Sequence, residues 1–319
     1  MQDNPSPWHG VQVSLAELMA LEFKARGLSL LAHQPRASLL AGNHGSRLRG
    51  RGLDFEELRR YQPGDDLRAL DWRASSRRGL PYVKTYHEER DRPALLLVDQ
   101  RMNMYFGSQR SFKSVLAAEL AALLGWMAWQ AGDRVGGLVF NDARIEAIAP
   151  RRSRQSVAAL LAAISRQNAA LSADSVLADA PGQLDLALRR CVQGGGHDQL
   201  ICIVSDFAGC TEASVQLLRQ LAAHNDVLAL QVYDPLALRL PERGRVLVTQ
   251  GQLQVELTLD RATVRKPLGD YLQGRLREVA ELLRRSRVPL LMFSSGEEAP
   301  LQLRRELGRE PRRGARSPV

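Results

Sequence analysis

Two aspartates stand at the ends of apolar runs that are typical of buried strands. Asp99 follows the run from Ala94 to Val98, and Asp206 lies two residues after the run from Leu200 to Val204. Ligands of open α/β sheets bind beyond the carboxyl ends of the strands, so we expect both carboxylates to lie at the functional edge of one sheet. There they could hold a hard cation or accept hydrogen bonds from a basic side chain.

A second concentration of charge lies between residues 50 and 93, where acidic and basic residues alternate around glycine and proline turn signals. We single out as an interaction or structural motif Arg51, Asp54, Glu56, Arg59, Tyr61, Gly64, Asp65, Asp66, Arg68, Asp71, Trp72, Arg73, Glu89 and Arg90. Paired carboxylates could do acid–base chemistry. Alternatively, arginines and carboxylates could fix an irregular loop, or the motif could dock a partner, with Tyr61 and Trp72 as packing anchors.

Other candidate catalytic groups lack the necessary neighbours. His44 and His87 have no nucleophile at a recognisable spacing, and Ser205 lacks the flanking glycines of a nucleophile elbow. The run Gly194–Gly196 has neither the Lys nor the Ser/Thr of a phosphate-binding loop, and it precedes a strand. These patterns favour a protein that is not an enzyme.

The composition is that of a soluble globular protein. Of 319 residues, 45% are hydrophobic and 25% are charged, so a sizeable core can form. The sparse cysteines Cys191, Cys202 and Cys210 fit a reducing cytosol, and no secretion signal is recognisable, so we expect a cytoplasmic protein. The most apolar run, from Val115 to Trp129, is too short to span a bilayer and predicts a buried helix.

The net charge of +9 raises the alternative of an anionic-surface or nucleic-acid binder. Much of the local excess lies near the carboxyl terminus, at Arg304, Arg305, Arg309, Arg312, Arg313 and Arg316. Elsewhere basic residues are mixed with acidic ones, and only 5% of residues are aromatic, which argues against a platform for stacked bases. Nucleic acid is therefore an unlikely partner.

Strand and helix patterns alternate after residue 93, which predicts an α/β fold with a mostly parallel sheet covered on both faces. We expect strands over 94–98, 134–140, 145–149, 200–204, 227–232 and 289–293, helices over 112–131, 153–167, 181–192, 211–224 and 263–287, and a hairpin over 245–259. The predicted organisation is a tail and amphipathic helix over 1–34, a small β-rich unit over 35–93, the α/β domain over 94–298, and a basic helix or tail over 299–319. In the first segment, Ser14 and Glu17 have the capping-box spacing, and apolar residues recur over 15–31, which predicts one amphipathic helix that Gly27 could interrupt.

The charged motif resembles that of the bacterial family called domain of unknown function 58. The resemblance is carried by the runs that start at Gly50, Asp71, Lys84, Phe106 and Gly132 and is strongest over residues 42–140. It implies a von Willebrand A-like domain for residues 94–298. It also implies association with a MoxR-type AAA+ ATPase, as an adaptor in chaperone-like maturation of protein complexes. Lacking the N-terminal membrane helices of many relatives, the chain resembles the soluble branch.

Von Willebrand A domains often hold Mg²⁺ in an adhesion site that starts with the pattern D-x-S-x-S. The resemblance places this pattern at Asp99–Asn103, where Arg101 replaces the first hydroxyl residue. If Mg²⁺ binds, its ligands would be Asp99, Asn103 and Asp206. The alternative is a metal-free apex in which the Arg101 guanidinium takes the place of the cation. The threonine expected from a second loop has no clear counterpart in the region from Ser172 to Gln183.

Overall fold

A computed structural model shows two compact units, described separately below. It describes residues 10–28, 53–61, 70–88, 92–173, 182–241, 245–250, 253–258 and 262–307. One unit comprises Met1–Pro35 together with Arg92–Val319, and the other comprises Arg36–Asp91. The smaller unit is thus an insertion between the first helix and the first strand of the larger one.

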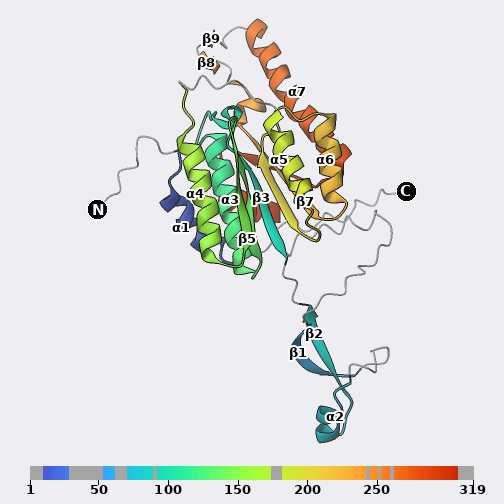
Figure 1. Ribbon diagram of the computed structural model, residues 1–319. Coiled ribbons are helices and arrows are strands. Elements are labelled where there is room, and N and C mark those ends of the chain that lie inside the picture. The colour runs from blue at the N-terminus through green and yellow to red at the C-terminus, as the bar shows by residue number, and fades with distance from the viewer. Residues whose placement is uncertain are drawn as a thin grey trace. The chain divides into compact units, whose positions relative to one another are not determined.

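A six-stranded sheet forms the centre of the larger unit (Figure 1). Its strands are β3 (Pro93–Asp99), β4 (Arg134–Phe140), β5 (Ile145–Arg151), β6 (Leu200–Ser205), β7 (Asp226–Tyr233) and β10 (Leu290–Ser294). They lie in the order β10-β7-β6-β3-β4-β5, and all pairs are parallel except β4–β5. The chain order switches direction between β3 and β6, where ligands of doubly wound folds bind.

Helices cover both faces of this sheet. One face carries α1 (Leu15–Ala25), α3 (Lys113–Gln130), α4 (Arg154–Ala169) and α8 (Ala299–Leu307), and the other carries α5 (Gly182–Gln193), α6 (Glu212–Ala222) and α7 (Ala262–Ser286). The prediction of an α/β fold with a mostly parallel sheet covered on both faces is confirmed. The predicted strands agree with the observed ones to within two residues at each end. All but β5 are parallel strands of the sheet, which are read from the sequence as short continuous apolar runs.

Helix α3 is buried on nearly every side, since it lies between the sheet and α1. Its apolar residues do not form a single stripe, which is typical of a helix covered all round. The indole nitrogen of Trp126 donates to the carbonyl of Leu18 at 3.3 Å. Thus the N-terminal helix packs on its own domain, and the apolar run from Val115 to Trp129 is a core helix, as expected.

Helix α1 begins as predicted and ends earlier. Ser14 and Glu17 form the expected capping box. The predicted helix continued to Leu31, but the described chain leaves the helix at Arg26, which is extended, and Gly27 has a φ of +79°. A glycine in this conformation commonly ends a helix. Among the described residues, no helix of this protein has the length and apolar character required to cross a bilayer.

The smaller unit contains a β-hairpin and a short helix. Strands β1 (Leu53–Arg60) and β2 (Tyr82–Glu88) are antiparallel, with Leu53 opposite Glu88. Helix α2 (Trp72–Arg78) lies in the connection between them and has no counterpart among the predicted elements. A second hairpin, β8 (Arg245–Gln250) with β9 (Leu253–Thr258), belongs to the larger unit.

Candidate functional site

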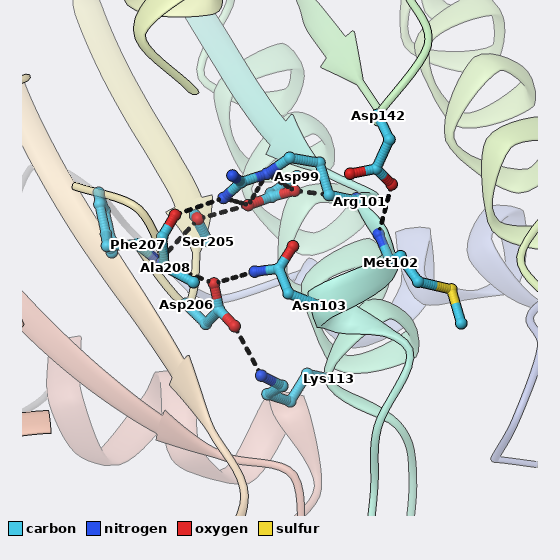
Figure 2. Close-up of polar contacts among 10 residues, drawn as sticks. All are labelled: Asp99, Arg101, Met102, Asn103, Lys113, Asp142, Ser205, Asp206, Phe207 and Ala208. Atoms are coloured by element: carbon cyan, nitrogen blue, oxygen red, sulfur yellow. Dashed lines mark hydrogen bonds and ion pairs between the residues drawn. The ribbon is translucent and has the colours of Figure 1, made fainter. Parts of the chain in front are cut away.

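The carboxyl end of β3 carries a buried ion pair. Arg101 Nε lies 3.0 Å from Asp99 Oδ1, and Arg101 Nη2 lies 2.7 Å from Asp99 Oδ2 (Figure 2). The side chains of Asp99 and Arg101 are 0% and 1% exposed. Although burial alone would lower it, the interaction with Asp99 raises the pKa of Arg101 above its ordinary value. A two-pronged contact of this kind is among the strongest hydrogen-bonded pairs available to a protein.

Strand β6 adds a second donor to Asp99. Ser205, its last residue, donates from Oγ to Asp99 Oδ2 at 2.6 Å and accepts from the backbone N–H of Phe207 at 2.8 Å. Arg101 Nη2 also donates to the carbonyl of Ala208 at 3.1 Å. Both carboxylate oxygens of Asp99 are therefore occupied by groups of the protein itself.

Asp206, one residue further along, meets a second internal cation. Lys113 Nζ lies 2.6 Å from Asp206 Oδ2, Asn103 Nδ2 lies 2.6 Å from Oδ1, and the backbone N–H of Ala208 lies 2.9 Å from the same Oδ1. Burial alone would raise the pKa of Asp206, but Lys113 and the backbone N–H of Ala208 hold that pKa below its usual value. The carboxylate is thus kept in its charged form.

The loop after β3 is tied to the ends of the neighbouring strands. The backbone N–H of Met102 donates to Asp142 Oδ2 at 2.6 Å, beyond β4. Ser108 donates from its backbone N–H and its hydroxyl to the carboxylate of Asp234, beyond β7, at 2.8 and 2.5 Å. Gly107 is required in this loop, because a Cβ there would lie 2.4 Å from the carbonyl oxygen of Ser111. We call this assembly of strand ends and the residue 100–112 loop the apex.

The apex does not offer the donor set of a magnesium ion. A hydrated Mg²⁺ needs carboxylate oxygens that are free to face it. Here Asp99 is occupied by Arg101 and Ser205, and Asp206 is occupied by Lys113 and Asn103. Within the described ranges, no group of three or more His, Cys, Asp or Glu side chains could hold a metal. The residues present fit the metal-free alternative, with two protein cations in place of one ion.

Most of the charged motif falls outside the residues whose side chains the structure describes. This applies to Arg51, Asp54, Glu56, Arg59, Gly64, Asp65, Asp66, Arg68, Glu89 and Arg90. Tyr61 is half-buried, and Asp71 caps α2 by accepting from the backbone N–H groups of Arg73 and Ala74 at 3.0 Å each. Trp72 is 74% exposed, so it does not act as a packing anchor within the described part of its unit.

Sequence reasoning brought Asp99, Arg101, Asn103 and Asp206 together correctly and missed several of their partners. Lys113 follows no strand, but it occupies the first turn of a predicted helix, so its proximity to the strand ends could have been inferred. The sequence pattern predicts no role for Ser205, whereas in the structure its hydroxyl donates to Asp99. Asp142 and Asp234 follow predicted strands directly or within two residues, as Asp99 and Asp206 do, and that shared position was the signal that could have identified them.

Solved structures with related folds show only distant similarity. The conserved hypothetical protein BatB from Bacteroides thetaiotaomicron matches 68% of this chain over 98% of its own, with 15% identity and a TM-score of 0.40. A von Willebrand factor type A protein from Catenulispora acidiphila matches 71% of this chain over 42% of its own, with 11% identity and a TM-score of 0.37. The fold is therefore described from its own sheet order and not from these similarities.

Sequence relatives are much closer. The chain is 30% identical over 275 residues to "Uncharacterized protein Rv1480" of Mycobacterium tuberculosis (strain ATCC 25618 / H37Rv), covering 86% of this chain and 84% of the relative. The same figures hold for "Uncharacterized protein Mb1516" of Mycobacterium bovis. The family model described as "Protein of unknown function DUF58" matches residues 57–272. The chain therefore belongs to the DUF58 family.

Proposed function

We propose that the protein is a non-enzymatic interaction module that works with a MoxR-type AAA+ ATPase in the maturation of protein complexes. The partner class follows from the family resemblance. The observation that carries the non-enzymatic part is the apex, where the chain's own cations neutralise both strand-end carboxylates. A preformed, internally neutralised edge is suited to holding a fixed surface against a partner.

The same geometry argues against catalysis at the apex. A general base must be free to take a proton, but Asp99 is buried against Arg101, and Asp206 is paired with Lys113. The Ser205 hydroxyl donates to Asp99 and has no basic partner among the described side chains that could activate it. Of the histidines with described side chains, His197 and His224 precede β6 and β7, at the opposite edge of the sheet.

A cytoplasmic location is part of the proposal. An AAA+ partner requires ATP, which is abundant in that compartment. The three cysteines are free thiols, as a reducing environment maintains them.

Association with the ATPase is the first test. The immobilised full-length protein is exposed to the purified MoxR-type ATPase of the same organism, without nucleotide, with ADP and with a non-hydrolysable ATP analogue. We expect binding whose affinity depends on the nucleotide. Phe106→Ala removes a 39% exposed side chain from the apex and should weaken this binding. The matched control is Leu186→Ala, which removes a 51% exposed side chain from α5 and should bind the ATPase like wild type. Absence of binding in all three nucleotide states would refute the partnership.

Calorimetry with Mg²⁺ and Mn²⁺ tests the metal-free apex. We expect no binding to the wild-type protein, because its carboxylates are already occupied. Magnesium binding that disappears in Asp99→Ala would instead establish the adhesion-site ligands Asp99, Asn103 and Asp206, and the proposal would then have to include a metal-bridged partner carboxylate.

A further inference from the structure

Helix α2 presents a tryptophan and two arginines to solvent. Trp72 is 74% exposed, and Arg73, Ser76 and Arg77 are also exposed. Residues four apart share a side of a helix, so Trp72 lies beside Ser76 and Arg73 beside Arg77. We call these four residues the α2 face. Tryptophan is on average one of the more buried residues, so an indole left this open calls for an explanation.

The α2 face is held in a fixed orientation. Asp71 caps the helix at its first turn, and Gly79 ends it with a φ of 68°. The Ser75 hydroxyl accepts from the backbone N–H of Tyr82 at 2.9 Å, so this side of the helix is turned toward β2. The backbone N–H of Asp71 donates to the carbonyl of Tyr82 at 2.9 Å as well. The backbone of α2 would therefore lose little conformational freedom when a partner binds, which favours binding at this face.

The hairpin carries the α2 face away from the point where the chain leaves the unit. Figure 1 shows α2 at the end of the hairpin where β1 gives way to β2. The seven residues from Tyr82 to Glu88 separate this tip from the exit of the chain. At about 3.3 Å per residue, the separation is roughly 20 Å. The α2 face therefore lies at one end of its own hairpin.

The charge of the α2 face selects the chemistry of its partner. Arg73 and Arg77 have no carboxylate partner among the described residues, and Asp71 directs a carboxylate oxygen at the helix backbone. Exposed arginines of this kind pair with carboxylates, and an indole face needs an apolar side chain to cover it. Nucleic acid fits less well, because one aromatic ring and two cations are few for a strand of stacked bases and phosphates.

We infer that the α2 face docks an acidic segment of a partner protein, with an apolar side chain of that segment covering Trp72. The inference rests on the proposed function, because it names the chemistry by which an interaction module would hold its partner. Tryptophan and arginine, together with tyrosine, are enriched among the residues that dominate binding energy at interfaces.

The test uses a fluorescein-labelled 15-residue peptide of Glu, Leu and Phe, with binding to the full-length protein measured by fluorescence anisotropy. We expect saturable binding that weakens at least tenfold in Trp72→Ala and at least tenfold in the double variant Arg73→Glu/Arg77→Glu. The matched control is Leu186→Ala/Arg189→Glu, which removes an exposed apolar side chain and an exposed arginine from α5 and should bind like wild type. Circular dichroism spectra identical to wild type verify that the variants are folded.

Equal affinity in Trp72→Ala and wild type would overturn the inference. So would tighter binding to a labelled peptide of Lys, Leu and Phe, or to single-stranded DNA in 150 mM salt. The ATPase assay separates this inference from the proposed function. If Trp72→Ala still binds the ATPase in a nucleotide-dependent manner, the role of the α2 face is refuted and the proposed function is not. If the peptide binds in a Trp72-dependent manner but the ATPase does not bind at all, the proposed partner is refuted and the role of the α2 face is supported.

Discussion

The apex and the α2 face use similar residues in opposite ways. At the apex, Arg101 is 1% exposed and lies on Asp99, so the charges cancel inside the protein. On the α2 face, Arg73 and Arg77 are exposed and have no carboxylate partner among the described residues. In both regions the sequence places an arginine two residues after an aspartate, Asp99–Arg101 and Asp71–Arg73. The same pattern can therefore neutralise itself or remain available to a partner, and the supporting elements decide which occurs.

The elements around the two regions differ in how much of the arginine side chains they bury. Arg101 leaves the end of a central strand, so its guanidinium has Phe140 on one side, 5.7 Å from the ring centre, and the β6 loop on the other. A charge buried at this position would be strongly destabilising without a partner of opposite charge, so the arginine must pair with a carboxylate. Helix α2 has only seven residues, and the side turned to β2 is occupied by Ser75. Its other side has no layer above it within the described part of the unit.

Removing the apex arginine should have the largest effect. In Arg101→Met, Asp99 remains buried without its cation, and we expect the free energy of unfolding to fall by about 3–5 kcal/mol. Urea denaturation followed by circular dichroism measures this. The double variant Asp99→Asn/Arg101→Met should recover part of the loss, since no charge is then stranded. A loss below about 1 kcal/mol in the single variant would mean that Asp99 has other support.

The second ion pair should contribute less, because Lys113 and Asp206 are 14% and 11% exposed. We expect Lys113→Met to lower stability by about 1–3 kcal/mol at pH 7. The folded-state pKa of Asp206 is depressed, so this contribution is present above the unfolded-state value of about 3.9 and is lost as the pH falls through the lower, folded-state pKa. Denaturation curves between pH 7 and pH 2 should therefore converge for variant and wild type at the acid end. Parallel curves would assign the depressed pKa to other groups.

The Ser205 hydroxyl makes a single strong bond to Asp99, at 2.6 Å. We expect Ser205→Ala to cost about 1.5–2 kcal/mol of stability, at the lower end for a hydrogen bond to a charged group, because Asp99 keeps its contact with Arg101. Thermal melting measures the shift. The same variant should retain full ATPase association, whereas loss of association in a protein that melts normally would give Ser205 a role that this geometry does not provide.

Truncating the exposed Trp72 should have the smallest effect on stability. We expect Trp72→Ala to alter the free energy of unfolding by less than about 0.5 kcal/mol, as exposed substitutions usually do. The buried Trp126 is the contrast, and its replacement by alanine should cost about 3–5 kcal/mol. Comparable losses in the two variants, measured by urea denaturation, would show that Trp72 is covered in solution and would remove the contrast between the two regions.

Much of the fold could be predicted because its signals are local. The strands of the larger unit are continuous apolar runs, and the capping patterns at Ser14 and Ser153 mark helix starts. Helix α2 was missed because seven residues give too few turns for a periodic pattern, and Asp71 and Gly79 are its only signals. The early end of α1 was suggested by Gly27, but apolar residues beyond it favoured a longer helix.

The site could be predicted only in part, because it joins distant segments. That Asp99 and Asp206 share an edge follows from the rule for strand ends, and the pairing of Arg101 with Asp99 follows from their spacing. The contacts of Lys113 with Asp206 and of Ser108 with Asp234 depend on the path of one loop across three strands. No local pattern encodes that path.

The insertion of the smaller unit between α1 and β3 has a consequence for biosynthesis. Leu18 on α1 and Trp126 on α3, which pack together, are 108 residues apart in sequence. At about 5–20 residues per second, the ribosome needs roughly 5–20 s to supply the second after the first. During that interval the apolar side of α1 has no native surface to cover it. Helix α1 can therefore reach its native packing only after α3 has been synthesised.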